Sequence, residues 1–409
     1  MTTRVNLLAV LLLVSVSAGW GAPAYEAPVI SVPLVSKGPV MDGKVDPAQW
    51  AQAAVLSDFV VGGGQKLPTL HTTVYVEYDA TNFYLAAVCS DPNAANLKTA
   101  AEKRDGPVLA DDCVQVAIDT VGQRKDVALL AVNAANVQYD AWNGDVSQSF
   151  KWESATSRGP DGWSLEMAVP FARGIGPAVG DSWLINVGRN APGAGELSSW
   201  APVDKSLEEK DRLGPLTFSG PPFRVKLRSL GELWVGKDLA QVEVGSWKSG
   251  PPLGAKLNAR VDGGGRSETA MEKITVGAEP SVIGMSYHVA ADGHSAVTFA
   301  LTVPGREGKA VVVWRSAAYP IDVPAVTAAL ETLEKTLSET SEAWARMPAG
   351  APKDALQASL GEVLTGWQNL AHRVAQRQSL SPADYSGLLT EAQSLNSTAQ
   401  ALQGQATGG

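Results

Sequence analysis

Alternating apolar and polar positions dominate the first half of the chain and predict β-strands. The apolar members of two clear runs are Val74, Val76, Tyr78, Val114, Val116 and Ile118. Each run would present one apolar face to a core. Turn-forming sequences, such as residues 79–82 and 159–162, separate the runs. From about 28 to 220 the pattern predicts an antiparallel β-sandwich, so we expect a mainly β protein.

A second β-rich region follows residues 220–222, Gly-Pro-Pro, because two prolines cannot continue a hydrogen-bonded strand. Short apolar runs then recur, separated by Gly, Pro and Asp turns. They cover residues 223–227, 240–244, 256–261, 281–288, 296–303 and 310–314. This rhythm predicts a small immunoglobulin-like sandwich over residues 221–322.

After Pro324 the apolar spacing changes to alternating steps of three and four residues, which is the pattern of a helical seam. Residues 348–352 and 379–382 interrupt it. The seam residues are Val326, Leu330, Leu333, Leu337, Trp344, Leu356, Leu360, Val363, Trp367, Leu370, Val374, Tyr385, Leu388, Ala392, Leu395, Ala399 and Leu402. We expect an antiparallel three-helix bundle over residues 323–405. An open coiled coil that trimerises or docks a partner is the alternative.

The N-terminus has the features of an export signal. Residues 7–16 are apolar and follow Arg4, and Ala22-Pro23-Ala24 supplies the small-x-small pattern for cleavage before Tyr25. Residues 1–24 are therefore predicted to be a signal peptide, and the apolar run is too short for a transmembrane anchor. We expect a secreted, periplasmic or cell-envelope protein.

Net charge limits the classes of binding partner, and the number of cysteines limits the possible metal and disulfide sites. The 409-residue chain carries a formal net charge of −9, which argues against nucleic acid and anionic membranes as partners. Its two cysteines, Cys89 and Cys113, are too few for a zinc site. In an oxidising compartment they could form a disulfide; the alternative is two small buried residues on neighbouring strands.

An ordered series of short motifs runs through the first region. It starts at residues 42–50, Asp-Gly-Lys-Val-Asp-Pro-Ala-Gln-Trp, and passes through the strand pair 74–79 and 83–92. Further along come residues 104–105, the Asp-Asp-Cys run of 111–119, and Gly162-Trp163 with Glu166, Pro170 and Phe171. Residues 183–189 and 213–216 end the series.

This series resembles the family 9 carbohydrate-binding module, a DOMON-like β-sandwich often appended to xylanases, over roughly residues 28–220. The resemblance implies non-catalytic binding of a polysaccharide or its chain ends in support of glycoside hydrolases, by raising their effective concentration at the substrate. It also implies a sugar site between two tryptophans, with calcium as a structural ion near the binding loops.

Two tryptophans in loop-like contexts are candidates for that sugar platform. Trp142 precedes the turn sequence Asn143-Gly144, and Trp200 stands between Ser199 and a proline-containing segment. An aromatic ring can stack on the CH face of a sugar. For both residues, packing in the core is the alternative.

A group of polar residues is expected near the same face. Arg104 is a candidate donor to sugar hydroxyls because its guanidinium group can hold two oxygens, and Asp105 lies beside it. Asp111 and Asp112 are further candidates for substrate binding. Asp112 and Asp119 are candidate calcium ligands, since hard cations prefer carboxylate and carbonyl oxygens. The alternative is that Asp112 pairs with Arg189 or Arg104.

The sequence favours a binding protein over an enzyme. It contains no nucleophile elbow, P-loop or dinucleotide-binding glycine motif. A cryptic glycoside hydrolase would need two carboxyl groups roughly 5–10 Å apart, for which Glu153 and Glu166 are the candidates. Another alternative is an envelope scaffold that has lost sugar binding and uses its helices to hold glycoside hydrolases or envelope proteins.

Overall fold

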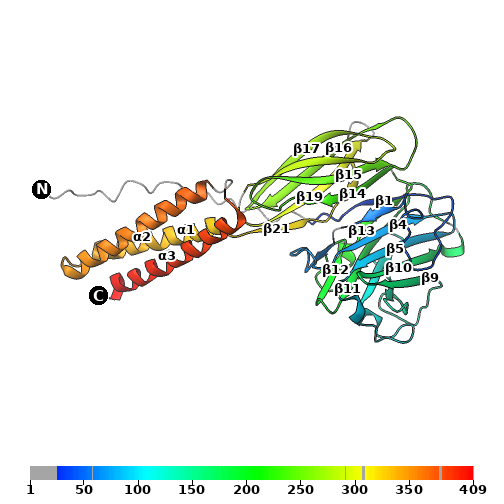
Figure 1. The fold of residues 1–409 in the computed structure, drawn as a ribbon, viewed down its shortest axis with the longest axis horizontal. Coiled ribbons are helices and arrows are strands. Elements are labelled where there is room, and N and C mark those ends of the chain that lie inside the picture. The colour runs from blue at the N-terminus through cyan, green and yellow to red at the C-terminus, as the bar shows by residue number, and fades with distance from the viewer. Residues whose placement is uncertain are drawn as a thin grey trace.

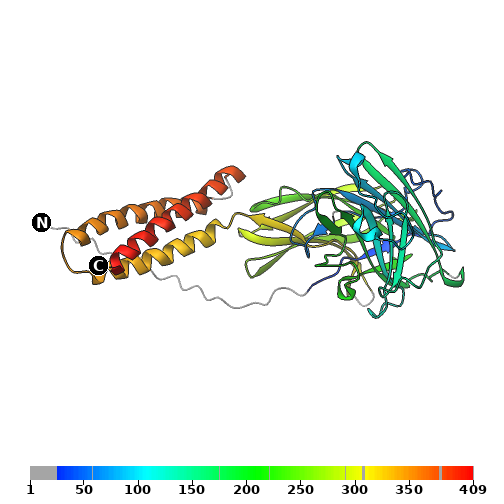
Figure 2. The same cartoon turned by 90° about the horizontal axis from the view of Figure 1, so that it is seen from below.

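The computed structural model describes residues 25–57, 59–174, 176–220, 222–290, 292–305, 309–376 and 380–408. The predicted signal peptide, residues 1–24, lies outside these ranges. The molecule is elongated: two β-sandwiches form one end and a bundle of three helices projects from the second sandwich (Figure 1; Figure 2). The predicted mainly β class with a C-terminal helical bundle is confirmed.

The first sandwich packs an eight-stranded sheet, here called the β6 sheet, against a five-stranded sheet, the β5 sheet. The β6 sheet contains β1 (Ile30–Val32), β3 (Val60–Val61), β6 (Cys113–Asp119), β7 (Ala128–Asn133), β8 (Gln138–Trp142), β11 (Ser182–Ala191), β12 (Glu196–Ser199) and β13 (Gly214–Phe218). The β5 sheet contains β2 (Ala54–Leu56), β4 (Thr72–Tyr78), β5 (Asn82–Ser90), β9 (Glu153–Gly159) and β10 (Gly162–Pro170). The predicted alternation gives the core, because Val74, Val76, Val114 and Val116 all lie between the two sheets.

Strand pairing in the first sandwich is antiparallel with one exception among the described strands, since β1 runs parallel to β13. β8 and β9 are the last strands of their sheets on the same side of the sandwich, and the side chains of Gln138 and Ser154 form a hydrogen bond between them. This edge is therefore closed by polar side chains rather than by a continuous strand ladder.

The second sandwich has a three-stranded sheet, the β15 sheet, and a five-stranded sheet, the β16 sheet. The β15 sheet contains β14 (Phe223–Ser229), β15 (Gly236–Ser246) and β18 (Ser281–Val289). The β16 sheet contains β16 (Leu253–Gly263), β17 (Arg266–Val276), β19 (Gly293–Pro304), β20 (Ala310–Arg315) and β21 (Tyr319–Val323). The sequence pattern predicted most of these strands but not β17 or β21.

The N-terminal segment contacts both sandwiches. The Tyr25 hydroxyl donates to the carbonyl oxygen of Arg212 in the first sandwich at 2.9 Å. The Glu26 carboxylate lies 3.3 Å from the Arg260 guanidinium group and 3.4 Å from that of Arg315, both in the second. Since β1 follows directly, these contacts tie the two sandwiches together near their junction.

The three helices are α1 (Val326–Arg346), α2 (Ala351–Ala375) and α3 (Pro382–Gly408). They form a closed bundle, as predicted: most of the seam residues are buried, while Trp344, Trp367 and Leu395 are partly buried at its margins. The core continues into the second sandwich, where the ring of Trp234 packs on Tyr385 at 5.8 Å between centroids. Within the described ranges, none of the helices has the length and apolar character needed to cross a membrane.

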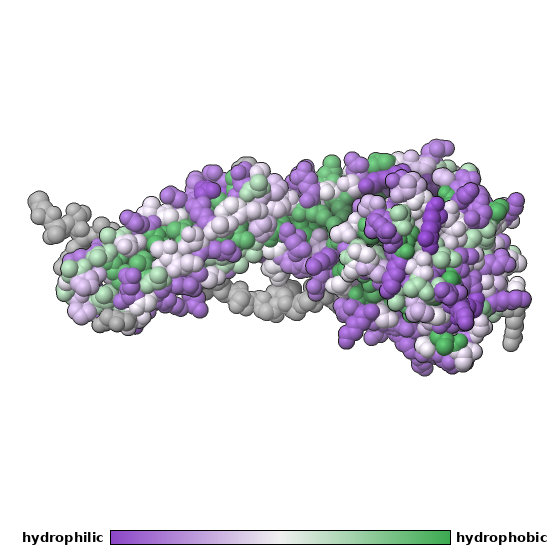
Figure 3. Space-filling view, turned by 60° about the horizontal axis from the view of Figure 1, so that its bottom comes forward, coloured by the Kyte–Doolittle hydropathy of each residue, from purple (hydrophilic) through white to green (hydrophobic). Residues whose placement is uncertain are grey.

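Surface hydropathy differs between the two ends of the molecule. In the view of Figure 3, hydrophilic side chains cover much of the sandwich end, and hydrophobic ones form a stripe along the bundle and near its junction with the sandwiches. Two segments of the chain fold back over the outer faces of the sheets of the first sandwich.

Candidate functional site

The motif at residues 42–50 covers the outer face of the β5 sheet. Glu166 on β10 points outward beneath it and is fully buried. One carboxylate oxygen accepts the backbone N–H groups of Asp42 at 3.0 Å and Gly43 at 2.9 Å, and the other accepts the Trp50 indole N–H at 3.0 Å. Glu166 is therefore a structural anchor. It cannot form a catalytic pair with Glu153, because its oxygens are occupied and shielded from substrate.

A second buried carboxylate of the β5 sheet, that of Glu77, lacks such a set of hydrogen bonds. Glu77, on β4, is 1% exposed, and its Oε2 atom has no hydrogen-bond partner within the described part of the chain. Burial raises the pKa of Glu77 to about 7, since a charged carboxylate is disfavoured away from water. The β5 sheet therefore has two buried carboxylates: Glu166 is hydrogen-bonded to the cover, and Glu77 has an oxygen without a partner among the described residues.

The expectation that Trp200 is an exposed platform is wrong. Its side chain is 4% exposed and lies in the main core of the first sandwich. The segment after it folds over the outer face of the β6 sheet. Asn186 holds this segment in place, because its side-chain amide donates to the Ala201 carbonyl and accepts the Ala201 N–H, both at 2.9 Å. Trp200 thus supports a cover rather than a ligand.

The acidic residues of the 111–119 run stabilise loops. Asp111 accepts the N–H groups of Ala100 and Ala101 at 2.9 Å, and Asp112 accepts that of Lys98 at 2.7 Å. Both are nearly fully buried, so neither carboxylate is offered to a ligand at the surface, contrary to the sequence-based expectation. Burial raises the pKa of Asp112.

The predicted ion pair of Asp112 with Arg189 or Arg104 does not form. Arg189 is buried and pairs with Asp91 at 3.0 Å, while it also donates to the Ser90 carbonyl oxygen at 2.8 Å. Arg104 pairs instead with Asp140. These two arginines tie loops to strands at different places in the first sandwich.

The candidate calcium ligand Asp119 belongs to a turn. Its carboxylate accepts the backbone N–H groups of Val121, Gly122 and Arg124 at 2.6–2.9 Å. Among the described residues, no group of three or more His, Cys, Asp or Glu side chains is arranged to hold a metal ion. The hydrogen bonds of Asp112 and Asp119 account for these carboxylates without a metal, and a calcium ion stays a prediction.

Cys89 and Cys113 are free thiols, so the predicted disulfide is not formed. Both are fully buried, and they belong to different packing clusters, Cys89 between the sheets and Cys113 on the outer side of the β6 sheet. Burial raises the pKa of each thiol to about 12. The alternative of two small buried residues is the one the structure supports.

Polar and aromatic side chains meet at the β8–β9 edge of the first sandwich, in a group that we call the edge cluster. Gln138, Asp140 and Trp142 alternate along β8 and so share one face of it. The loop after β8 brings further members. The edge cluster consists of Arg104, Gln138, Asp140, Trp142, Phe150 and Trp152.

Arg104 holds the edge cluster together. Its guanidinium group donates to Gln138 Oε1, to Asp140 Oδ1 and, at 2.8 Å, to the Phe150 carbonyl oxygen, and lies 5.8 Å from the centre of the Trp152 ring. The Phe150 N–H in turn donates to Asp140 at 2.5 Å. Arg104 therefore positions Phe150 and β8, and its donors are directed at protein acceptors.

Asp105 supports the same arrangement from the side. It has a positive φ of 61°, and its carboxylate accepts the Asp140 N–H at 3.0 Å. The expected neighbourhood of Arg104, Asp105 and Trp142 is thus brought together, whereas Asp111, Asp112 and Trp200 are not part of it. The sequence did not identify Gln138, Asp140 and Phe150 as members of this group. The signal that could have identified them is their position in the chain, since Gln138 and Asp140 precede the Asn143-Gly144 turn and Phe150 follows it.

Trp142, like Phe150, is a half-buried aromatic residue of the edge cluster, and it stands at a tight turn. Asn143 and Gly144 have φ angles of 50° and 80°, and the backbones of Trp142 and Asp145 form reciprocal hydrogen bonds of 3.1 and 2.9 Å. The Trp142 ring lies 6.2 Å from that of Phe150 with an interplanar angle of 53°. This places two inclined rings beside a loop with exposed polar residues.

Comparisons with known proteins agree with the sequence resemblance. Residues 41–200 match the model of the family described as carbohydrate family 9 binding domain-like. A search of the curated proteins finds no match.

Solved structures with similarity include a family 9 module from Caldicellulosiruptor kristjanssonii in complex with cellotriose, which is 19% identical, with 47% of this chain and 93% of that chain covered and a TM-score of 0.37. A putative carbohydrate-binding protein from Bacteroides uniformis is 15% identical, with 47% and 100% covered and a TM-score of 0.39. The family match does not extend to the second sandwich or the helical bundle, and it identifies residues 41–200 as a family 9 carbohydrate-binding-like domain.

Proposed function

We propose that the first sandwich binds carbohydrate without catalysis, and that the edge cluster is the binding site. The match of residues 41–200 to a carbohydrate-binding family is the observation that carries this proposal. Within that domain, Trp142 combines a half-buried ring with a position on a turn, and so can offer a ring face to a ligand.

The edge cluster has the two kinds of surface that a sugar requires. The inclined rings of Trp142 and Phe150 can contact the CH groups of a pyranose. The loop after Asn143 adds exposed polar residues that can meet hydroxyl groups. Arg104 contributes by positioning: because it fixes the Phe150 carbonyl and the Asp140 carboxylate, the rings keep their relative angle when the site is empty.

The wider biological role follows from this site and from the N-terminal sequence. With a cleavable signal at residues 1–24, the protein would be exported and would hold polysaccharide, or its chain ends, near glycoside hydrolases that degrade it. The long bundle projects away from the binding domain and leaves it accessible (Figure 1). Partner proteins would be held by the bundle in this scheme.

Titration calorimetry with cello- and xylo-oligosaccharides tests the proposal. We expect weak binding, with a dissociation constant of about micromolar to millimolar. Trp142→Ala should reduce the affinity about fivefold or more, because an aromatic stack contributes on the order of 1 kcal/mol beyond the buried area. Trp344→Ala, which removes a partly buried indole from the distant bundle, is the matched control and should bind as the wild type does.

Two outcomes would contradict the proposal. If Trp142→Ala and the wild type bind equally well, the sugar site lies elsewhere in the domain. If the wild type binds no member of a broad polysaccharide panel, the carbohydrate function itself is wrong, and an envelope scaffold with a protein partner becomes the better interpretation. Thermal melts of both variants separate lost binding from lost folding.

A further inference from the structure

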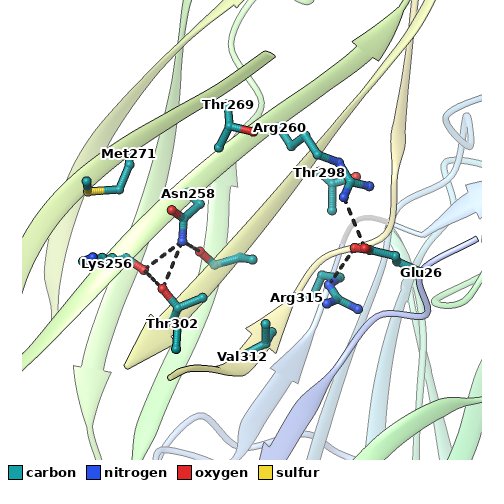
Figure 4. A pocket seen from close by; sticks show the side chains of 12 residues that line it. Glu26, Lys256, Asn258, Arg260, Thr269, Met271, Thr298, Thr302, Val312 and Arg315 are labelled. Atoms are coloured by element: carbon teal, nitrogen blue, oxygen red, sulfur yellow. Dashed lines mark hydrogen bonds and ion pairs between the residues drawn. The ribbon is translucent and has the colours of Figure 1, made fainter. Parts of the chain in front are cut away.

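The outer face of the β16 sheet is hollowed into an open groove of about 450 Å³ (Figure 4). Four neighbouring strands of this sheet provide its floor and walls, and Glu26 from the N-terminal segment closes one end. The residues that carry the argument are Glu26, Lys256, Asn258, Arg260, Thr302 and Arg315. The groove belongs to the second sandwich, which the family match does not cover.

Positive charge without an ion-pair partner lies at one end of this groove, where Lys256 is a lining residue. Lys256 on β16 stands directly opposite Lys273 on β17, and both side chains are exposed. Like charges in this cross-strand position repel each other. Among the described residues, neither ammonium group takes part in an ion pair, whereas the chain as a whole carries a net charge of −9. An anion bound between the two lysines would relieve the repulsion.

The other end of the groove already holds a carboxylate. Arg260 and Arg315 both contact Glu26, at 3.3 and 3.4 Å, and Figure 4 shows its carboxylate between the two guanidinium groups. This contact is intramolecular. It shows that a carboxylate can approach the face of this sheet and be held by cations on two of its strands, β16 and β20. Arg260 also pairs with Asp262 at 2.9 Å.

Between the two ends the floor is polar and uncharged, with small apolar contacts. The Asn258 amide donates to Thr302 Oγ1 at 3.1 Å, and Thr269 and Thr298 line the same face. Met271, Ala300 and Val312 add apolar surface. Hydroxyl, amide and small apolar groups in alternation suit a ligand that has hydroxyls and CH faces. Because the groove lies on the face of the sheet and not at its edge, a peptide cannot bind there by adding a strand to the sheet.

We propose that this groove binds an acidic oligosaccharide, a sugar chain that carries uronate carboxylates. One carboxylate lies between Lys256 and Lys273, and the sugar hydroxyls contact Asn258 and Thr302 along the floor. The distance from Lys256 to Arg260 along β16 is about 13 Å, which accommodates a short stretch of sugar chain. The site is separate from the edge cluster and does not depend on it.

Calorimetry of the full chain with oligogalacturonides tests the groove. The double variant Lys256→Glu, Lys273→Glu should bind these acidic sugars about tenfold more weakly, because two exposed charge contacts are lost. Lys237→Glu is the matched control, since Lys237 is an exposed strand lysine on the opposite β15 sheet. It should leave the affinity unchanged.

The proposal also requires that the carboxylates be recognised. Methyl-esterified oligogalacturonides should bind no better to the wild type than to the double variant, and rising salt should weaken binding of the free acid. Absence of oligogalacturonide binding by the wild type, or an equal loss in Lys237→Glu, overturns the proposal. So does equally tight binding of poly-glutamate, which would show a surface selective for anions but not for sugar. If the edge cluster proves not to bind sugar, each of these results still tests the groove, because the groove variants lie in the second sandwich.

Discussion

The outer faces of the first sandwich are covered, whereas the outer face of the β16 sheet in the second sandwich is bare. Residues 42–50 cover the β5 sheet and the segment after Trp200 covers the β6 sheet. The groove on the β16 sheet is instead lined by Lys256, Asn258 and three threonines. Both sandwiches have an extensive apolar core between their sheets, so they differ in whether the outer face of a sheet is covered by another segment of the chain.

The comparison shows what a cover requires. A segment laid over a sheet must satisfy its own backbone N–H and C=O groups, and a buried polar side chain from the sheet can do this. Glu166 serves residues 42, 43 and 50, and Asn186 serves Ala201. On the outer face of the β16 sheet, Arg315 donates to the Ala27 carbonyl oxygen at one end, whereas at the other end Lys256 and Lys273 form no ion pair within the described residues.

The largest effect should come from the core residue that directly precedes the β6 cover. Trp200→Ala removes a nearly fully buried indole from the core and should lower the free energy of unfolding by about 3–5 kcal/mol. Urea unfolding followed by fluorescence or circular dichroism measures it. A loss below about 1 kcal/mol would show that Trp200 is not packed as described.

Next in size is the anchor of the β5 cover. Glu166→Gln keeps the shape but offers one acceptor oxygen in place of two, so N–H groups of the cover lose a buried partner. We expect a loss of about 2–3 kcal/mol, because a buried donor left unpaired costs about 1–3 kcal/mol. Glu153→Gln, on the exposed surface of the neighbouring β9, is the control and should be near neutral; equal effects in both variants would contradict the role of Glu166.

Glu77 should behave in the opposite way to Glu166, because removing its charge should stabilise the protein. Because burial raises the pKa of Glu77 to about 7 from 4.5, the folded state binds the proton more tightly than the unfolded state does. Its contribution to stability is complete below about pH 4.5 and is lost as the pH rises towards 7.

Glu77→Gln should remove this pH dependence and stabilise the protein at pH 8 by on the order of 2 kcal/mol. Unfolding curves of wild type and variant at pH 5 and pH 8 measure the difference. A variant that is equally destabilised at both values would show that the Glu77 carboxylate has partners that compensate its charge. The Glu153→Gln protein again serves as the control.

Much of the fold could be predicted because its signals are local. The alternation around Val74 and Val114 identified core strands, and the three-and-four spacing identified the buried seam from Val326 to Leu402. β17 was missed because it is exposed along most of its length and therefore has no apolar alternation. A strand of this kind is recognisable only from its partner, β16, through eleven paired positions.

The site was predicted only in part, since burial is decided by contacts distant in sequence. Trp142 and Trp200 both precede turn-like sequence, yet Trp200 is buried in the core between the two sheets whereas Trp142 is partly exposed. Arg104 was recognised as important, but its true partners, Asp140 and Phe150, come from a strand and a loop more than thirty residues away. Residue type alone could not distinguish a ligand donor from a positioning residue.

The smallest effect should appear on the bare face. Lys273→Glu replaces a like-charge pair opposite Lys256 by an opposite-charge pair, and we expect a gain of only about 0.5 kcal/mol, because such cross-strand pairs are solvent-exposed. Lys237 lies opposite His288 in the β15 sheet, so Lys237→Glu removes no lysine pair. Thermal melts at low and high salt measure the difference, which should shrink as salt screens the charges. A gain that is unchanged by salt, or equal in the two variants, would mean that Lys256 and Lys273 do not repel each other, and the electrostatic reason for an anion at this end of the groove would disappear.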